Sequence, residues 1–568
     1  MRVLGIEGTA WCASAAVYDS ETDDVHIESD PYLPDSGGIH PREAAEHMSD
    51  ALPSVVDAAL SYAEREYGRA SIDAVAFSRG PGLGPCLRTA GTAARSLAGS
   101  LSVPLVGVNH MVAHLEIGRH RSGFENPICL NASGANAHVL GYHDDRYRVL
   151  GETMDTGVGN AIDKFTRHVG WSHPGGPKVE AAAADGEFLE LPYVVKGMDF
   201  SFSGIMSAAK DRYDEGAPVE DVCFALQEHV FAMLTEVAER ALSLTGADEL
   251  VLGGGVGQND RLREMLEAMC TQRGASFFAP EPRFLRDNAG MIAVLGAKMA
   301  AAGDVVPIRE SSVDPNFRPD EVPVTWRPGD ESIREGPRTE HTERARDGVE
   351  RTDRDHTGAE ATVELLGDNR VRKRRRSRTY RHPELDGTLR RSRTTLEARL
   401  LNEARRAGVP TPLVHDVDVA NATLTLQHVG ERDLADALAH GTDASRVHTR
   451  TVGRHLARLH DAGIVHGDPT TRNVRIRSIE EPDANVDGTI ADAPGSRPHT
   501  YLIDFGLGYH TGHVEDHAMD LHVLEQAVAG TAMDPESLLD AFESGYLSVG
   551  DSAVIDRLRT IEGRGRYR

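Results

Sequence analysis

The first 324 residues alternate between short apolar runs and long amphipathic runs, and this alternation constrains the fold more than any other feature. RVLGIEG, IDAVAFS, PLVGVN, PICLNASG and ELVLGGGV have the length and apolar content of strands. Residues 41–68 and 223–246 carry apolar side chains at the spacing of amphipathic helices. Strands that alternate with helices in this way predict an α/β fold.

Cysteine usage and hydropathy predict a soluble, cytoplasmic protein. The five cysteines are scattered and form no C-x-x-C pair, which argues against a disulfide framework and favours a reducing compartment. The N-terminal segment has no apolar core or cleavage site of a signal peptide. No apolar run reaches the roughly 18 residues that span a bilayer, so we expect no membrane contact.

The charge balance is strongly acidic. The chain has 88 Asp and Glu against 61 Lys and Arg, and only six residues are lysine. Such a surface is typical of a protein that stays soluble at high salt, although a high-GC genome would produce a similar bias. The net charge of −27 disfavours nucleic-acid binding. Any RNA contact therefore requires local basic patches, such as the terminal RLRTIEGRGRYR, whose alternative is a solvated chain end.

Composition divides the chain into three parts. Residues 1–325 carry the strand and helix alternation, and residues 326–356 are charged, apolar-poor and without periodicity, which predicts a flexible linker. Residues 357–568 form a further domain, interrupted at 478–499 by an acidic segment that we expect to be disordered.

Glycine-rich turns follow three of the predicted strands, in SRGPGLGPCLR, LNASGANAH and VLGGGVGQNDRLREML. Glycine lets backbone N–H groups approach a phosphate, and the N-terminus of a following helix favours an anion. A single turn of this kind is as common without a ligand. Three of them, together with GNAIDKFTRHVGWSHPGGPKVE, favour a nucleotide site.

Two histidines, His110 and His114, lie four residues apart in a segment with helical periodicity. Residues at this spacing share one helix face, so both imidazoles can bind one metal ion. The alternative is that they bind nothing, as most of the 26 histidines do. Zinc-protease chemistry is excluded because Met111 stands where those enzymes place their glutamate base.

The ordered motifs NHMVAHLEIGR, SGAN, GNAIDKF, PGGPKVE, GGGVGQNDRLRE and RDNAGMIA resemble the universal tRNA threonylcarbamoyltransferase family of the TsaD type, over residues 1–320. The resemblance implies a two-lobed actin/Hsp70-like α/β fold. It also implies transfer of a threonylcarbamoyl group from threonylcarbamoyl-adenylate to N6 of the adenosine at tRNA position 37, beside the anticodon, in tRNAs that read codons starting with adenine.

The same resemblance implies a metal site formed by His110, His114 and Asp287. Two histidines and a carboxylate suit one divalent metal, iron rather than zinc, that polarises the threonylcarbamoyl group. Asn131 stands where the family often has a tyrosine that reaches the metal, so we expect it only to contact substrate. The implied substrate contacts are Asn131, Ala132, Ser133, Gly134, Ala135, Asp163, Gly176, Glu180 and Asn259. Asp163 and Glu180 suit ribose hydroxyls, because a carboxylate accepts two hydrogen bonds; their alternative role is loop capping.

The last part contains the motif elements of a kinase. IVHGDPTTRNVRI places Asp468 and Asn473 at the spacing of a catalytic loop, and YLIDFGLG places Asp504 in a D-F-G triplet. Asp468 is the predicted catalytic base, whereas Asn473 and Asp504 hold magnesium on ATP. Lys373, the only lysine of this part, is predicted to bind the α- and β-phosphates, with Glu397 as its ion-pair partner.

This part resembles the small atypical kinase of the KEOPS complex, through YRHPELDGTLRRSRTTLEARLL and the HGD triplet. It lacks G-x-G-x-x-G and A-P-E, so the turn with Gly358, Ala359 and Glu360 is the candidate phosphate cover. Pro469 replaces the usual leucine and Arg378 a frequent lysine. The resemblance implies a reduced protein-kinase-like α+β domain that hydrolyses ATP and phosphorylates serine weakly.

We therefore expect a bifunctional fusion of a transferase and an atypical Ser/Thr kinase/ATPase. Its expected partners are tRNA, threonylcarbamoyl-adenylate, ATP with magnesium, and the small dimerising and kinase-activating KEOPS subunits. Two alternatives are a signalling kinase with an N-terminal scaffold, and a small-molecule kinase or ATPase of the actin/Hsp70 class. The short region after D-F-G argues against the first, and the second gives His110, His114 and Asp287 no reason to converge.

Overall fold

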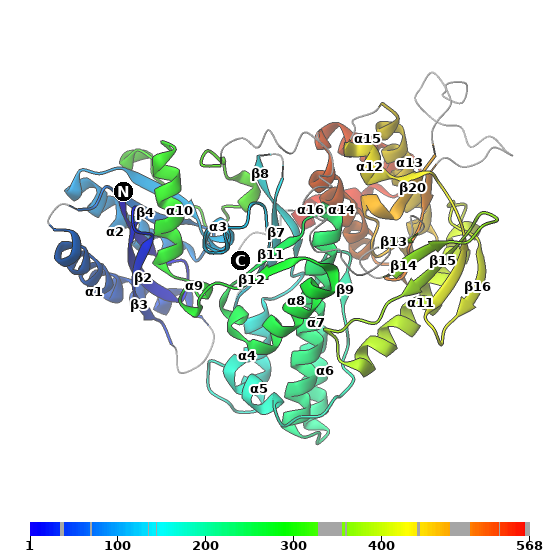
Figure 1. Ribbon diagram of the computed structural model, residues 1–568, viewed down its shortest axis with the longest axis horizontal. Coiled ribbons are helices and arrows are strands. Elements are labelled where there is room, and N and C mark those ends of the chain that lie inside the picture. Colours follow the sequence, from blue (N-terminus) through cyan, green and yellow to red (C-terminus); the bar gives the residue numbers. More distant parts are fainter. Residues whose placement is uncertain are drawn as a thin grey trace.

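The computed structural model describes residues 1–33, 39–68, 71–134, 136–143, 145–327, 355–357, 361–439, 443–477, 500–532 and 534–562. Two α/β lobes and a third body, made of a sheet and a helical cluster, follow one another along the long axis in Figure 1. Among the described residues, no helix is long and apolar enough to cross a membrane.

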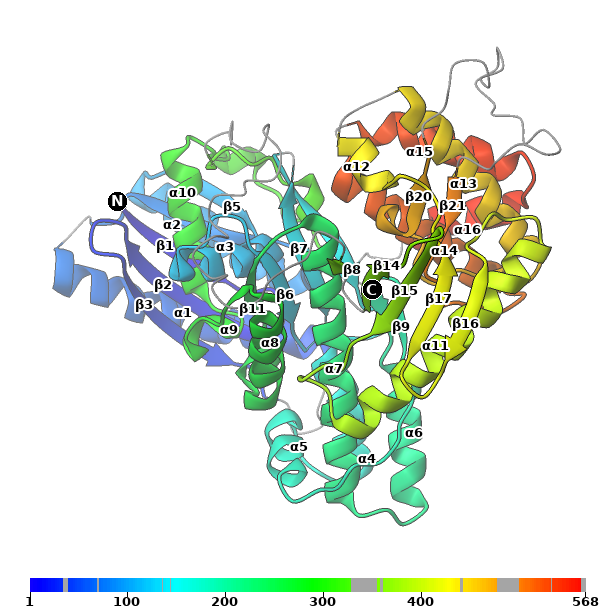
Figure 2. The ribbon, with the colours of Figure 1, turned by 45° about the vertical axis from the view of Figure 1, so that its right-hand side comes forward.

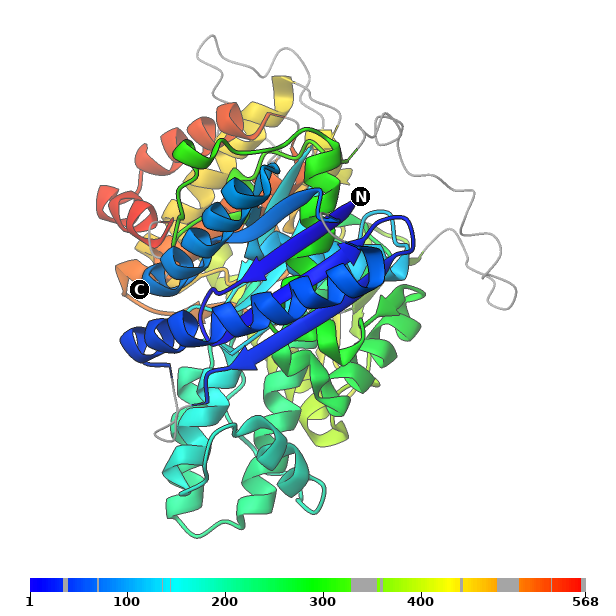
Figure 3. The ribbon, with the colours of Figure 1, turned by 90° about the vertical axis from the view of Figure 1, so that its left-hand side faces the viewer.

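The first lobe is a five-stranded sheet with the order β3-β2-β1-β4-β5. Its strands are β1 (Arg2–Glu7), β2 (Cys12–Asp19), β3 (Asp24–Pro31), β4 (Ala74–Gly80) and β5 (Leu105–Asn109). The first three pair antiparallel, and β1, β4 and β5 pair parallel. Helices α1 (Pro41–Tyr67) and α2 (Gly84–Leu101) cover the face seen in Figure 3, and α3 (His110–Ser122) and α10 (Ala289–Ala301) pack in a separate apolar cluster. Burial on both faces explains why β1 and β2 are apolar runs and not alternating ones.

The second lobe repeats this topology, with the order β8-β7-β6-β11-β12. Its strands are β6 (Ile128–Ala132), β7 (Ala137–His143), β8 (Arg146–Glu152), β11 (Glu249–Gly253) and β12 (Ser276–Phe278), beside the short β9 (Val195–Lys196) and β10 (Asp199–Phe200). The main helices are α4 (Val158–His168), α5 (Gly176–Ala183), α6 (Ser203–Asp214), α7 (Val219–Thr245) and α8 (Asp260–Arg273), with the short α9 (Pro282–Leu285). The repeated strand order confirms the prediction of a two-lobed actin/Hsp70-like α/β fold.

The C-terminal body joins an antiparallel sheet to a helical cluster. The sheet has the order β13-β14-β15-β17-β16, from β13 (Asp355–Thr357), β14 (Ala361–Leu365), β15 (Arg370–Arg375), β16 (Val414–Asp418) and β17 (Thr423–Gln427). Helix α11 (Pro383–Arg406) packs against it. The helical cluster contains α12 (Leu434–Ala439), α13 (Asp443–Asp461), α14 (Val514–Thr531), α15 (Pro535–Leu547) and α16 (Ser552–Glu562). Short strands accompany it: β18 (Arg432–Asp433), β19 (Ile464–Val465), β20 (Val474–Ile476), β21 (Thr500–Leu502) and β22 (Tyr509–His510).

Both ends of the predicted linker are ordered parts of their neighbours. Trp326 stacks on Tyr147 with ring centroids 6.4 Å apart, and the Arg327 guanidinium lies 3.8 Å from the ring centroid of Tyr142. At the other end, Asp355–Thr357 pairs with β14. Trp326 and Arg327 therefore belong to the second lobe, and Asp355–Thr357 belongs to the C-terminal sheet. Charge composition alone does not reveal the aromatic contact of Trp326 or the short strand. Residues 328–354 and the acidic segment 478–499 lie outside the described residues.

A buried ionic network joins the C-terminal body to the second lobe. Glu236 of α7 lies 2.6 Å from the Arg381 guanidinium and 3.0 Å from that of Arg393, and Arg378 lies 3.0 Å from Glu239. Tyr380 is 1% exposed and belongs to the apolar core of the second lobe. Figures 1 and 2 show the start of α11 beside α7. The second lobe and the C-terminal body are therefore held together by direct contacts between their own side chains.

Candidate metal centre and nucleotide sites

The two predicted metal-binding histidines lie on the first turns of α3. Asn109 caps this helix: its side-chain oxygen accepts hydrogen bonds from the backbone N–H groups of Met111 and Val112. The helix begins directly after β5, so His110 lies at the carboxyl end of an edge strand that pairs parallel with β4. His110 and His114 are both buried, and their ring centroids are 4.9 Å apart.

Asp287 comes from the loop between α9 and α10 and meets both histidines. Its Oδ1 lies 3.3 Å from His110 Nε2 and 3.5 Å from His114 Nε2. The candidate ligand atoms of the three residues lie within 4.8 Å of one another. The structure thus brings together the three residues that the sequence resemblance assigned to one ion, although His114 and Asp287 are 173 positions apart.

The electrostatics of this cluster fit a bound cation. Both ring nitrogens of His114 are buried and make no hydrogen bond to described residues. No described protein group therefore donates a hydrogen bond to the nitrogen that carries the lone pair. Burial opposes charge on His110, but the carboxylates of Glu7 and Asp287 outweigh it and raise the pKa of His110 to about 10. Burial also lowers the pKa of His114. Carboxylates that favour positive charge beside a neutral imidazole match the donor set of a divalent metal.

Glu7 is a residue of this site that the sequence reasoning missed. Its Oε2 lies 3.1 Å from His110 Nδ1, so Nδ1 carries the proton and leaves Nε2 facing Asp287. Glu7 is fully buried and also accepts hydrogen bonds from the Ser78 hydroxyl and from Thr9. An acidic side chain at the end of an otherwise apolar strand was the available signal.

The predicted substrate residues line a cavity of about 380 Å³ that also reaches His110 and Asp287. Those on its wall are Asn131, Ser133, Gly134, Asp163, Gly176, Glu180 and Asn259. Ala132 is buried in β6 and does not line the cavity, and Ala135 lies outside the described residues. A cavity of this size suits small ligands and not a folded macromolecule.

Several of these side chains also hold the wall itself in place. Asp163 accepts a hydrogen bond from the Gly175 N–H at 2.8 Å, and Glu180 accepts one from the Asp260 N–H at 2.9 Å. Asn259 caps α8 by accepting from the Leu262 N–H. Loop capping, the alternative considered for Asp163 and Glu180, is therefore real. The second oxygen of Asp163 lies 3.0 Å from His173 Nδ1, whereas Glu180 keeps a second oxygen for a ligand.

Asn131 lies deep in the same wall. It is 1% exposed; its amide nitrogen lies 3.8 Å from Met111 Sδ, and its amide oxygen has no hydrogen-bond partner among the described residues. The structure thus places an amide oxygen, and no phenol, at this point of the cavity wall.

The C-terminal body brings its predicted nucleotide residues together. Lys373 Nζ lies 2.7 Å from Glu397 Oε1 and 2.7 Å from Asp504 Oδ1. Arg375, which the sequence reasoning missed, adds a second cation 2.7 Å from Glu397. Burial raises the pKa of Glu397, while Lys373 opposes this shift. Gly358, Ala359 and Glu360 lie outside the described residues, between the paired strands β13 and β14.

The predicted catalytic loop has the expected internal contact and one unexpected partner. Asn473 Nδ2 donates to the Asp468 carboxylate at 2.9 Å. Arg240, from α7 of the second lobe, lies 3.2 Å from the same carboxylate. A residue of the first half thus contacts the candidate catalytic base of the other half, a contact that no local pattern could reveal.

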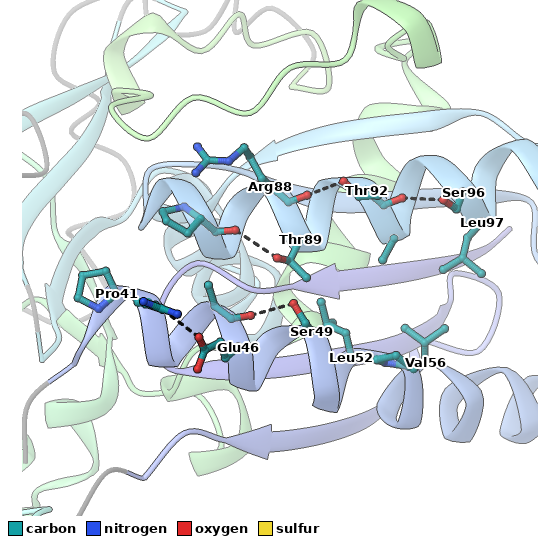
Figure 4. Close-up of a pocket in the computed structure, with 15 residues that line it drawn as sticks. Pro41, Glu46, Ser49, Leu52, Val56, Arg88, Thr89, Thr92, Ser96 and Leu97 are labelled. Atoms are coloured by element: carbon teal, nitrogen blue, oxygen red, sulfur yellow. Dashed lines mark hydrogen bonds and ion pairs between the residues drawn. The ribbon is translucent and has the colours of Figure 1, made fainter. Parts of the chain in front are cut away.

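A larger open cavity of about 1040 Å³ lies elsewhere, between α1 and α2 (Figure 4). Its hydroxyl groups bond to carbonyls of their own helices: Ser49 to Ala45, Thr92 to Arg88, and Ser96 to Thr92. Because these polar groups are already satisfied, the groove lacks the converging donors of a reaction site.

Comparisons with known proteins identify the family of this chain. Residues 22–294 match the family model of tRNA N6-adenosine threonylcarbamoyltransferase. Three relatives named as probable bifunctional tRNA threonylcarbamoyladenosine biosynthesis proteins align with the whole chain. Those from Halobacterium salinarum and Haloquadratum walsbyi are 64% and 63% identical, over 99% and 100% of their own lengths. The one from Methanospirillum hungatei is 48% identical over 99% of its length. The chain therefore belongs to the family of bifunctional tRNA threonylcarbamoyladenosine biosynthesis proteins.

Proposed function

We propose that the first half transfers a threonylcarbamoyl group from threonylcarbamoyl-adenylate to N6 of the adenosine 3′ of the anticodon, at position 37, in tRNAs that read codons starting with adenine. The single observation that carries this proposal is the convergence of His110, His114 and Asp287 at a cavity whose opposite residues suit a nucleotide. Family membership supplies the tRNA substrate.

His110, His114 and Asp287 hold the metal in this proposal, and iron fits the two-histidine, one-carboxylate set better than zinc. When bound, the metal supplies Lewis acidity toward a carbonyl oxygen of the donor. Glu7 fixes the His110 ring so that Nε2 points at the ion. The transfer breaks the bond between the carbamoyl carbon and the adenylate phosphate oxygen, so AMP leaves with that oxygen. The carbamoyl carbon bonds to N6, and the proton that N6 loses passes to the departing phosphate or to water.

The second-lobe wall orients the adenylate part of the donor. Asp163 and Glu180 accept hydrogen bonds from ribose hydroxyls. The Ser133 N–H donates to the Asn136 carbonyl, which leaves the neighbouring Gly134 N–H for the phosphate. Gly159 approaches Gly134 so closely that a Cβ on residue 159 would lie 2.7 Å from Gly134 Cα, which explains the glycine at position 159.

The C-terminal half is proposed to be an atypical Ser/Thr kinase/ATPase that supports the same modification. Lys373, paired with Glu397, binds the ATP phosphates, and Asn473 and Asp504 hold magnesium. Gly358, Ala359 and Glu360 form the phosphate cover, and Asp468 is the catalytic base. The signalling-kinase alternative is disfavoured because Asp468 faces Arg240 of the second lobe, where a peptide substrate would have to enter.

The proposed partners are tRNA and the KEOPS subunits, namely the small dimerising subunit and the kinase-activating subunit, in the cytoplasm. The basic segment that ends the sequence is proposed to contact tRNA phosphates, which makes that contribution salt-sensitive.

Purified chain, labelled threonylcarbamoyl-adenylate and tRNA test this proposal, with the partner subunits and at high salt. We expect label in the tRNA with wild-type protein and its loss with His114→Ala. His120→Ala is the matched control, because His120 lies on the same helix, pairs with Asp23, and is outside the metal cluster. Absence of transfer by metal-loaded wild-type protein contradicts the proposal, and Asp468→Asn shows whether the ATP-binding half is required.

A further inference from the structure

The turn between β1 and β2 presents a tryptophan to the cavity. Glu7 holds this turn by accepting hydrogen bonds from the N–H and hydroxyl of Thr9, and Leu83 donates its N–H to the Thr9 carbonyl at 2.8 Å. The Trp11 carbonyl accepts a hydrogen bond from the Tyr32 N–H. The backbone is therefore fixed, yet the indole is only partly buried and lies on the cavity wall.

Trp11 lies on the first-lobe wall, away from the residues proposed to contact the donor. The second lobe contributes those polar residues together with apolar side chains such as Leu226 and Phe231, whereas the first lobe contributes the aromatic Trp11 and Tyr32 beside Leu33 and Ile39. Leu33 is 60% exposed and Ile39 is 36% exposed, so apolar surface remains open at the mouth of the cavity. Because the proposed donor contacts all lie on the second lobe, the aromatic surface of the first lobe is left for the acceptor.

Arg286 extends this aromatic surface. It immediately precedes the ligand Asp287, is exposed, and its guanidinium carbon lies 6.0 Å from the Trp11 ring centroid. An arginine over an indole forms a cation–π pair, and both groups offer flat faces to a nucleobase. Arg286, one member of this pair, is therefore the chain neighbour of the proposed metal ligand Asp287.

The size of the cavity decides how an acceptor reaches this surface. About 380 Å³ holds a small ligand and not a folded anticodon loop, so the target base has to leave its stack and enter alone. We propose that the acceptor adenine of tRNA stacks on Trp11, with Arg286 beside it, which directs N6 toward the metal cluster. This inference rests on the proposed transferase function and adds the binding site of the acceptor base.

Stacking also suits the charge of this chain. The net charge of −27 repels a phosphate backbone, and at 1 M salt the Debye length is only about 3 Å. Contacts between charged groups and phosphates are then weak, whereas stacking of a base on an aromatic ring persists. Binding at the Trp11 surface is therefore expected to vary little with salt.

The test compares Trp11→Leu, which keeps apolar bulk without an aromatic face, with Trp11→Phe, which keeps the face. The probe is an anticodon stem-loop with 2-aminopurine at the target position, because an indole quenches 2-aminopurine that stacks on it. At saturation, Trp11→Leu is expected to give brighter emission than wild type. The KM for tRNA should rise about 5- to 150-fold, the range that one lost base–aromatic stack implies. Trp11→Phe should restore most of the KM for tRNA, whereas its emission should stay brighter than that of wild type because a phenyl ring does not quench 2-aminopurine as an indole does.

The donor serves as the internal control. The KM for threonylcarbamoyl-adenylate should stay constant in Trp11→Leu, and Trp171→Phe should change neither signal. A higher donor KM with an unchanged tRNA KM would assign the indole to the donor and overturn the inference, as would an unchanged Trp11→Leu protein. The emission experiment needs no transfer, so it still decides the question if the proposed transferase function itself fails.

Discussion

Glu236 is the centre of the contact between the two halves, and neutralising it should loosen that contact. One carboxylate oxygen lies 2.9 Å from Arg240 and 3.0 Å from Arg393, and the other lies 2.6 Å from Arg381. Glu236 is 1% exposed. In Glu236→Gln the shape is kept, but three buried guanidinium groups lose a shared counter-charge. Removing one partner of a buried ion pair costs about 3–5 kcal/mol.

The assay measures association of the halves after a protease site, inserted between residues 327 and 355, has been cut. A loss of about 3–5 kcal/mol weakens the dissociation constant of the halves about 150- to 5000-fold. Glu220→Gln is the control, because Glu220 lies exposed on the first turn of the same helix. A change below about tenfold in Glu236→Gln would contradict this prediction, since it would mean that other contacts, such as the Arg378–Glu239 ion pair and apolar packing, hold the interface without Glu236.

Three further predictions follow from single residues. Glu7→Gln should lower metal affinity about 10- to 100-fold, measured by metal analysis after dialysis, because His110 loses the carboxylate that orients it. Asp468→Asn should abolish ATP hydrolysis, measured as phosphate release, and leave the bound metal of the first half unchanged. Burial raises the pKa of Asp199 to about 7, so its contribution to stability is full near pH 4 and is lost as pH rises through 7. Asp199→Asn should therefore flatten the dependence of the unfolding free energy on pH between about 4 and 7, measured by denaturant titration; an unchanged slope contradicts this.

Local patterns predicted the parts of the site that depend on local geometry. His110 and His114 share a helix face because they are four residues apart. Asn109 caps the same helix through its own neighbours, so this contact depends only on local sequence. Asp287 was reachable only through the motif resemblance, because no periodicity relates it to α3. The alternation of strands and helices predicted the α/β class, and the structure adds the repeated strand order.

Contacts between distant segments were beyond the sequence. Glu7 meets His110 across 103 positions, and Arg240 meets Asp468 across the contact between the two halves. Glu7 and Arg240 are charged side chains inside apolar segments. Such a position indicates that the side chain is buried, but it does not identify the residue that it contacts. The linker boundary failed for a similar reason: Trp326 is anchored by its ring against Tyr147, which charge composition does not reveal.

The central claim is that the His110, His114 and Asp287 cluster holds the metal on which transfer depends. The most direct measurement is the initial rate of threonylcarbamoyl transfer to tRNA by chelator-treated protein as iron or zinc is titrated back. We expect no transfer without metal and an initial rate that saturates at about one metal per chain. In His114→Ala, added metal should not restore the rate. Full transfer by metal-free wild-type protein would contradict this claim.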